Sequence, residues 1–288
     1  MNAAQIAERL NLKKYRDEFR GNCPACGYPS AFVLSTGKYS PIGWCSVCQN
    51  RDAVAAALEA AGADNAPRHP NALQPAKDSP EAKQKAREAA KRIWMGSVAA
   101  TPDNAAGIYL CRRAIGEAIT SPAIRYRPDC PHPSGERHHA MICAIQDSLG
   151  GLVAVQRVYL TSGGHKASVT PQKACKGPLW GGAIRFDDIA SDIVIAEGPE
   201  TAISAGIITG LPAWSAISAG NLKSGLKLPP EVRSIIIAAD NDKPGIEAAE
   251  GAAARWEREG IRVRIIRPKQ IDADFNDILQ SRRGGSVK

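Results

Sequence analysis

Three acidic residues, Glu197, Asp240 and Asp242, follow apolar runs that are typical of buried strands. Residues 193–196 precede the glutamate, and residues 235–239 precede the first aspartate. Because parallel strands end at one edge of a sheet, where α/β folds keep their sites, we expect the three carboxylates to converge. Such an anionic cluster is unfavourable unless Mg²⁺ or Mn²⁺ neutralises it, and hard oxygen ligands select these ions. On a basic chain this pattern indicates phosphate chemistry on nucleic acid.

Each acidic motif alone is weak, since most D-x-D pairs are solvated turn residues. A third element, Asp274-Phe275-Asn276-Asp277, opens the last expected helix. The side chain of Asp274 can cap that helix, and this role is compatible with a place near the other acids. Order, spacing and strand context together are more specific than any one motif.

Cysteines form a second candidate site. Four of the eight cysteines make two Cys-x-x-Cys pairs, Cys23 with Cys26 and Cys45 with Cys48. Thiolate pairs at this spacing can close a tetrahedral site, and in a reducing compartment metal ligation is their expected role. We therefore predict a structural Zn²⁺ in a zinc ribbon, with Gly27 at its tight turn.

Basic and aromatic side chains accompany the ribbon, and those of Lys38 and Trp44 suit contact with a single strand of nucleic acid. The alternative is that the aromatic side chains form the core of the ribbon. Further along, the span 101–186 is richer in Lys and Arg than in Asp and Glu. Its candidate phosphate contacts are Arg125, Arg127, Lys166, Lys173 and Lys176.

The remaining cysteines lack a recognisable pattern. Cys130 and Cys143 lie near His132, His138 and His139, but this spacing matches no common zinc site. We therefore favour buried or incidental cysteines there over a second metal site. Cys111 and Cys175 have no predicted partner.

The overall composition is typical of a globular protein that binds a polyanion. The chain has 288 residues, 44% hydrophobic residues, a formal net charge of +8 and a pI of about 9.1. It has no signal-peptide pattern and no apolar run that could cross a membrane. We expect a soluble, cytoplasmic protein with no membrane partner.

The predicted fold is α+β and multidomain. We expect a zinc-ribbon template-binding domain at 1–61, a linker at 62–79, a helical and antiparallel β region at 80–190 and an α/β domain with a mainly parallel sheet at 191–288. In the last domain, we expect strands at 192–196, 213–217, 234–239 and 262–266 and helices at 199–209, 244–259 and 274–280. Before them, we expect helices at 3–10, 51–61, 80–95 and 101–113.

The motifs in combination resemble a known family. EGPET at 197–201, AADND at 238–242 and DFNDIL at 274–279, behind CPACG at 23–27 and CSVC at 45–48, are similar to motifs of the Toprim-type DNA primases, above all those of phages and plasmids. This resemblance implies synthesis of short RNA primers on single-stranded DNA by metal-dependent nucleotidyl transfer. It implies ribonucleoside triphosphates as substrates and a separate protein as any replicative helicase.

The resemblance also implies roles for individual residues. Asp240 and Asp242 match the metal-binding pair of the family, and Glu197 matches its glutamate, a metal ligand or general base. Asp274 and Asp277 match the late acidic motif as further ligands. Where many Toprim motifs have an aspartate this chain has Thr201, so the neighbouring Glu200 is assigned a supporting role.

Two other functions are compatible with the same residues. A Toprim nuclease or topoisomerase would cleave phosphodiesters, although a topoisomerase also needs a nucleophilic tyrosine in a separate domain. A non-catalytic module would use the ribbon to hold DNA and the Toprim fold to recruit a partner.

Overall fold

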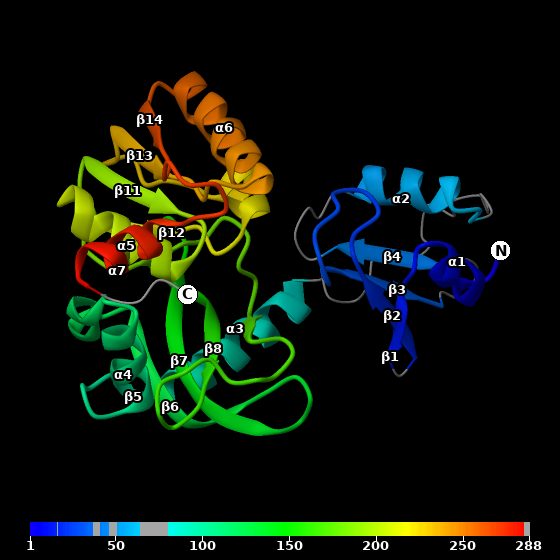
Figure 1. The fold of residues 1–288 in the computed structure, drawn as a ribbon, viewed down its shortest axis with the longest axis horizontal. Helices are drawn as coiled ribbons and strands as arrows, with labels where there is room; N and C mark the ends of the chain where they lie inside the picture. The colour runs from blue at the N-terminus through cyan, green and yellow to red at the C-terminus, as the bar shows by residue number, and fades with distance from the viewer. Residues whose placement is uncertain (16, 37–40, 46–50, 64–79, 285–288) are drawn as a thin grey trace. The chain divides into compact units, whose positions relative to one another are not determined.

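The computed structural model describes residues 1–15, 17–36, 41–45, 51–63 and 80–284. The chain divides into two compact units, Met1–Pro75 and Ala76–Lys288 (Figure 1). In the described part of the chain, every helix is too short or too polar to cross a bilayer. The predicted linker at 62–79 falls almost wholly outside the described residues.

The first unit is a small antiparallel sheet with two helices. Its elements are α1 (Ala3–Arg9), β1 (Lys13–Tyr15), β2 (Glu18–Gly21), β3 (Phe32–Ser35), β4 (Ile42–Cys45) and α2 (Arg51–Ala60), and the strand order is β1-β2-β3-β4. Ile6, Phe32, Leu34, Val54 and Leu58 form much of its core. Both helices begin where the sequence predicts.

The second unit begins with a five-stranded antiparallel sheet and its helices. The elements are α3 (Pro80–Met95), β5 (Val98–Ala99), α4 (Ala105–Arg112), η2 (Gly116–Thr120), β6 (Ile124–Pro131), β7 (Arg137–Gln146), β8 (Leu152–Leu160) and β9 (Lys173–Lys176), with strand order β5-β6-β7-β8-β9. Side chains alternate along β7: Met141 and Cys143 lie in one core with Tyr109 of α4, and Ala140 and Ile142 lie in another with α3. Both faces of this sheet are therefore covered.

The helix expected at 101–113 begins later than predicted. α4 starts at Ala105 because Asn104 is its cap, and the Asn104 side chain accepts a hydrogen bond from the Gly107 amide at 3.2 Å. Thr101-Pro102-Asp103 forms the preceding turn instead of the first helical turn.

The second sheet is mainly parallel. Its elements are β10 (Ile184–Arg185), β11 (Asp192–Ala196), α5 (Pro199–Thr209), β12 (Ala213–Ser215), η3 (Asn221–Gly225), β13 (Ser234–Ala238), α6 (Lys243–Arg258), β14 (Arg262–Ile266) and α7 (Phe275–Arg282). The strand order is β10-β12-β11-β13-β14, and only β10 is antiparallel to its neighbour. The multidomain α+β class and the parallel sheet are confirmed, while β12 is shorter than its expected range of 213–217.

Helices cover both faces of this sheet. Ile193 and Ile195 of β11 lie in one core with α6, whereas Val194 and Ala196 lie in another with α5 and α7. Figure 1 shows α6 on one side of the strands and α5 and α7 on the other. Strands buried on both faces require continuous apolar runs, which explains why the sequence pattern located them well.

Candidate active site and metal centres

The acidic site lies where β11 and β13 end. These parallel strands pair from Asp192 with Ser234 to Ala196 with Ala238. Glu197 directly follows β11, and Asp240 follows β13 by two residues. The chain turns there because the Glu197 carbonyl accepts hydrogen bonds from the Ile217 amide at 2.8 Å and from the Ser215 hydroxyl at 2.7 Å.

The carboxylates are close enough to disturb one another. Burial raises the pKa of Glu197 to about 7, and the charges of Asp240 and Asp242 add to the shift. Burial also raises the pKa of Asp240 to about 6, with further contributions from Asp274 and Asp242. Burial also raises the pKa of Asp274. The structure thus brings together four acids from strand ends and helix starts that are far apart in the sequence.

Two of these acids also cap helices. Asp242 is the N-cap of α6 and accepts a hydrogen bond from the Gly245 amide at 2.7 Å. Asp274 caps α7 by accepting from the Asp277 amide at 2.9 Å, and Asp277 returns the contact by accepting from the Asp274 amide at 3.1 Å. The cap of α6 therefore uses one oxygen of Asp242, and the cap of α7 uses one oxygen of Asp274. The role of Asp277 as a metal ligand stays a prediction.

Hard divalent cations fit this set of residues. Every converging side chain offers carboxylate oxygen, the ligand type that Mg²⁺ and Mn²⁺ prefer. Burial is the main cause of the raised pKa values of Glu197 and Asp240, and neighbouring carboxylate charges add to it; a bound cation would offset both effects. Among the described residues, Asp240 accepts one long hydrogen bond, 3.4 Å, from Thr201, and its carboxylate caps no helix.

Glu200 lies almost fully buried beside the site and has three partners. Its carboxylate accepts from the Tyr109 hydroxyl at 2.5 Å and from Lys173 Nζ at 2.8 Å, and Lys166 Nζ lies 3.8 Å away. Burial alone would raise the pKa of Glu200, but Lys173, Lys166 and Tyr109 outweigh it and hold that pKa well below its usual range. Glu200 thus joins α5 to α4 and to the antiparallel sheet, an arrangement that suits a supporting residue.

The basic residues predicted as phosphate contacts lie in different places in the second unit. The charge of Lys173 reaches Glu197 and Asp240 and lowers the pKa of both, although larger effects raise them. Arg125 stacks over the Trp94 ring at 4.5 Å from its centroid. Arg127 and Lys176 line a separate cavity of about 570 Å³ together with Arg92 and Arg157.

Sequence reasoning missed three residues around the acids. Arg113, at the end of α4, lies near enough to Asp274 for its charge to lower the pKa of that acid against the effect of burial. Asn276 is fully buried and donates to the Arg113 carbonyl at 2.7 Å and to the Ser204 hydroxyl at 2.9 Å. Tyr109 contacts Glu200 as described above. Only Asn276 lay within a recognised motif, because the other two come from a helix remote in sequence.

The described cysteines of the ribbon also converge. The sulfur atoms of Cys23, Cys26 and Cys45 lie within 4.8 Å of one another, and Cys26 Sγ is 3.8 Å from Cys45 Sγ. Tetrahedral Zn–S bonds of about 2.3 Å place sulfur atoms about 3.8 Å apart, so this spacing suits zinc. Burial raises the pKa of the Cys23 thiol, so the thiolate is disfavoured there in the absence of a metal ion. A cation beside the sulfur would favour the thiolate. Gly27 has a left-handed backbone with φ 73, as its place in a tight knuckle requires.

Three other ribbon residues were predicted to bind zinc or nucleic acid. Cys48 and Lys38 lie outside the described residues. Trp44 is 44% exposed, so its ring is not enclosed in the core of the first unit, and its contact with a single strand stays a prediction.

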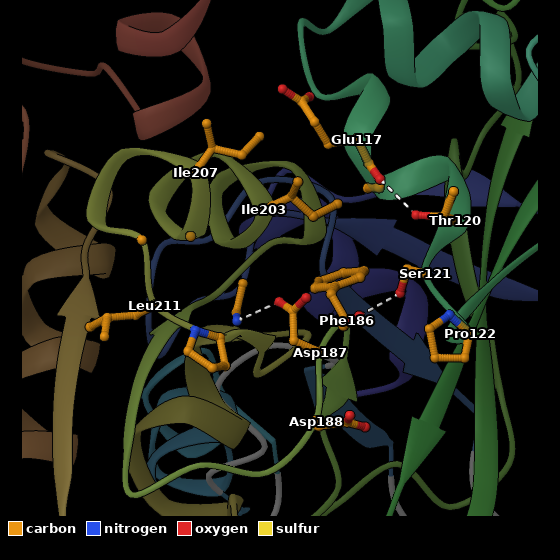
Figure 2. Close-up of a pocket in the computed structure, with 15 residues that line it drawn as sticks. Glu117, Thr120, Ser121, Pro122, Phe186, Asp187, Asp188, Ile203, Ile207 and Leu211 are labelled. Atoms are coloured by element: carbon orange, nitrogen blue, oxygen red, sulfur yellow. Dashed lines mark hydrogen bonds between the residues drawn. The ribbon is translucent and has the colours of Figure 1, made fainter.

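A further cavity, of about 580 Å³, lies between η2, α5 and the start of β12 (Figure 2). Its lining includes three acids, Glu117, Asp187 and Asp188, and contains neither Lys nor Arg. Figure 2 shows Asp187 bonded to a backbone nitrogen, that of Ala213, at 2.9 Å. Glu117 is paired with Arg283 at 2.6 Å, and we assign this cavity no role in the reaction.

Comparison with known families identifies two parts of the chain. Residues 192–284 match the model of the Toprim domain, and residues 84–186 match a domain of unknown function (DUF7146). The C-terminal part is therefore a Toprim domain, and the Toprim resemblance inferred from the sequence is confirmed. A search among curated proteins found no match.

Solved structures of primases are similar to this chain. The zinc-binding and RNA polymerase domains of the Aquifex aeolicus primase share 14% identity with a TM-score of 0.47, over 98% of this chain and 80% of that one. The primase fragment of the bacteriophage T7 primase-helicase shares 14% identity with a TM-score of 0.44, over 93% and 95%. The E. coli primase catalytic core shares 14% identity with a TM-score of 0.45, over 71% and 76%.

Proposed function

We propose that this protein is a DNA primase that joins ribonucleotides into short RNA primers on single-stranded DNA, in replication of the phage or plasmid type. Its partners would be the DNA template, ribonucleoside triphosphates and a separate replicative helicase. The ribbon would contact the template, and the Toprim domain would hold the reacting groups.

The observation that carries this proposal is the convergence of Glu197, Asp240, Asp242 and Asp274 on a Toprim domain. Burial and the charges of neighbouring acids disfavour the ionised forms of Glu197 and Asp240, and divalent cations would offset both effects. Lys173 and Arg113 bring positive charge to the same place from the antiparallel sheet and α4. Acids beside fixed cations suit a reaction between a hydroxyl group and a triphosphate.

Each residue then has a distinct task. Asp240 and the free oxygen of Asp242 would hold Mg²⁺ or Mn²⁺, and Glu197 would ligate metal or accept the proton of the attacking hydroxyl. When bound, the ions would stabilise charge on the attacked phosphate and on the leaving group. Lys173 and Arg113 would attract the triphosphate. Glu200 would fix Lys173 in position through the 2.8 Å ion pair.

Incubation with a long natural single-stranded DNA, ribonucleotides and Mg²⁺ or Mn²⁺ tests the proposal. We expect new short oligonucleotides with the unaltered protein and a loss of about a hundredfold or more with Asp240→Asn, because several kcal/mol of charge stabilisation disappear. Asp240 is the best target because its carboxylate caps no helix, unlike those of Asp242 and Asp274. The exposed Asp103→Asn serves as the matched control.

Other outcomes favour the other candidate functions. A shortened template that depends on Asp240 would indicate a Toprim nuclease. Binding of DNA with neither new nor shortened strands would indicate a non-catalytic module, and primer synthesis by Asp240→Asn at the normal rate would refute the assigned site.

A further inference from the structure

A cluster of two imidazoles and a carboxylate lies at the turn between β6 and β7. One ligand atom from each of His132, Glu136 and His138 lies within 4.8 Å of the other two. The turn is tight: the His132 amide donates to the Glu136 carbonyl at 2.8 Å, and the Gly135 amide donates to the His132 carbonyl at 3.0 Å. Gly135 permits this turn through its left-handed backbone, with φ 96. The hairpin therefore places the three side chains together without help from the Toprim domain.

The tautomer of His132 is fixed by its surroundings. Its Nε2 lies 3.1 Å from the Pro171 carbonyl, which can only accept a hydrogen bond, so Nε2 carries the proton. The lone pair is then on Nδ1, which points at the Ser134 hydroxyl at 2.8 Å and at the Ser134 amide at 3.1 Å. A histidine that donates one ring N–H to a carbonyl and presents the other nitrogen is the usual arrangement of a metal ligand.

The group around Ser134 is held by hydrogen bonds that a bound ion would replace. The Ser134 amide donates to His132 Nδ1 at 3.1 Å, and the Ser134 hydroxyl lies 2.8 Å from the same nitrogen and 3.3 Å from Glu136 Oε2. Glu136 Oε2 also lies 3.2 Å from His138 Nε2. A cation at this point would take the place of these protons on the lone pairs of the two histidines and the glutamate.

Distances agree with a tetrahedral ion. Zn–N and Zn–O bonds of about 2.0–2.1 Å place neighbouring ligand atoms about 3.3 Å apart. The separation of 3.2 Å between His138 Nε2 and Glu136 Oε2 already meets this value. The other two separations are at most 4.8 Å and must close by up to about 1.5 Å. Rotation of the Glu136 side chain, which is 66% exposed, can shorten its distance to His132.

We propose that His132 Nδ1, His138 Nε2 and the Glu136 carboxylate bind one zinc-type transition metal ion, with the fourth position open to water or to the Ser134 hydroxyl. Two imidazoles select Zn²⁺ over Mg²⁺, in contrast to the all-carboxylate site of the Toprim domain. The ion would tie the hairpin to the segment that contains Pro171. His132 also lines the basic cavity with Arg92 and Lys176, so the ion would border that cavity.

Zinc stoichiometry of the full chain tests this site independently of primase activity. The protein is saturated with Zn²⁺ in the presence of excess Mg²⁺, freed of unbound metal and measured for zinc per chain. We expect the Glu136→Gln/His138→Gln double variant to hold one ion fewer than the unaltered protein. His165→Ala is the matched control, because His165 is exposed and lies away from the cluster in a different turn. Circular dichroism of each variant verifies the fold.

Cobalt separates this ion from the ion of the ribbon. Co²⁺ on thiolates gives a sulfur-to-metal charge-transfer absorption, whereas Co²⁺ on imidazole and carboxylate does not. We expect the double variant to lose only the absorption without sulfur character and to bind Co²⁺ at that site at least about tenfold more weakly. Equal zinc content in the double variant and the unaltered protein would overturn the proposal, and so would loss of the same ion in His165→Ala.

Discussion

The cysteine cluster of the first unit and the carboxylate site of the Toprim domain are both candidate metal centres, but they relate to folding in opposite ways. The described cysteine sulfur atoms come from the turn after β2 and from the end of β4, and they already have the spacing of a zinc site, 3.8 Å between Cys26 and Cys45. Their unit has a small core, so the ion would contribute directly to folding. The acids instead sit on a sheet that is covered on both faces, and they repel one another there. We therefore expect the first site to need a metal for structure and the second, which the fold already forms, to need one for charge.

Removing zinc is the strongest way to test this contrast. We expect a chelator, or Cys26→Ser, to unfold the described part of residues 1–63 and to leave the second unit folded, because the binding free energy of a structural zinc is folding free energy. Two separate unfolding transitions by circular dichroism, with zinc content measured alongside, verify this. The exposed Cys111→Ser is the control. A first unit that melts unchanged without zinc would contradict the comparison.

Lys173 tests how the second site is supported. Lys173→Met leaves the buried Glu200 carboxylate with a weaker set of partners, so we expect a loss of roughly 2 kcal/mol in the free energy of unfolding, discounted because Lys173 is one-third exposed. Glu200→Gln in the same chain should restore part of this loss. Chemical denaturation measures both, with the exposed Lys176→Met as control. Unchanged stability would contradict the support of Glu200 by this ion pair, whether or not nucleotide affinity is lost.

Trp44 tests whether the ribbon contacts the template. We expect Trp44→Ala to weaken binding of single-stranded DNA by about 1 kcal/mol, or roughly fivefold, because an exposed aromatic ring stacks on bases. Fluorescence anisotropy with a labelled oligonucleotide at several salt concentrations measures the change. Trp180→Ala, at an equally exposed tryptophan of the second unit, should leave the affinity unaltered. Equal losses in both variants would remove the ribbon as the contact.

The smallest expected effect is the pH dependence of the metal-free protein. The folded-state pKa values of Glu197 and Asp240, about 7 and about 6, lie above the ordinary values of 4.5 and 3.8. The folded state therefore holds more protons on these two groups, and their contribution to the free energy of unfolding should fall as the pH rises from about 4 to about 7. We expect less than about 1 kcal/mol per group, since both are partly exposed.

Thermal melts at about pH 5 and about pH 8, with and without Mg²⁺, measure this effect. Saturating Mg²⁺ should remove the decline, because the bound ion stabilises the ionised carboxylates. Asp240→Asn should flatten the metal-free profile. Equal pH profiles of the metal-free unaltered protein and the metal-free Asp240→Asn variant would contradict the contribution of Asp240.

The sequence located the Toprim strands closely because strands buried on both faces must be continuously apolar, as β11 and β13 are. It misplaced the start of α4 because Thr101-Pro102-Asp103 has the composition of a helix start, while Asn104 makes the actual cap. It also grouped Lys166 and Lys173 with three other basic residues as phosphate contacts. Their position beside the buried Glu200 depends on how two sheets pack, and no local pattern encodes it.

By itself, the sequence determined the elements of this protein and the chemical character of two sites, because apolar periodicity, cysteine spacing and acids after strands are local properties. Only the tertiary structure decided which side chains share a site. It brought Arg113 and Tyr109 of one helix region to the acids of the Toprim domain, and it paired His132 with His138 across a hairpin. Such contacts depend on strand register and on the packing of remote elements, and each is fixed by the burial of many residues at once.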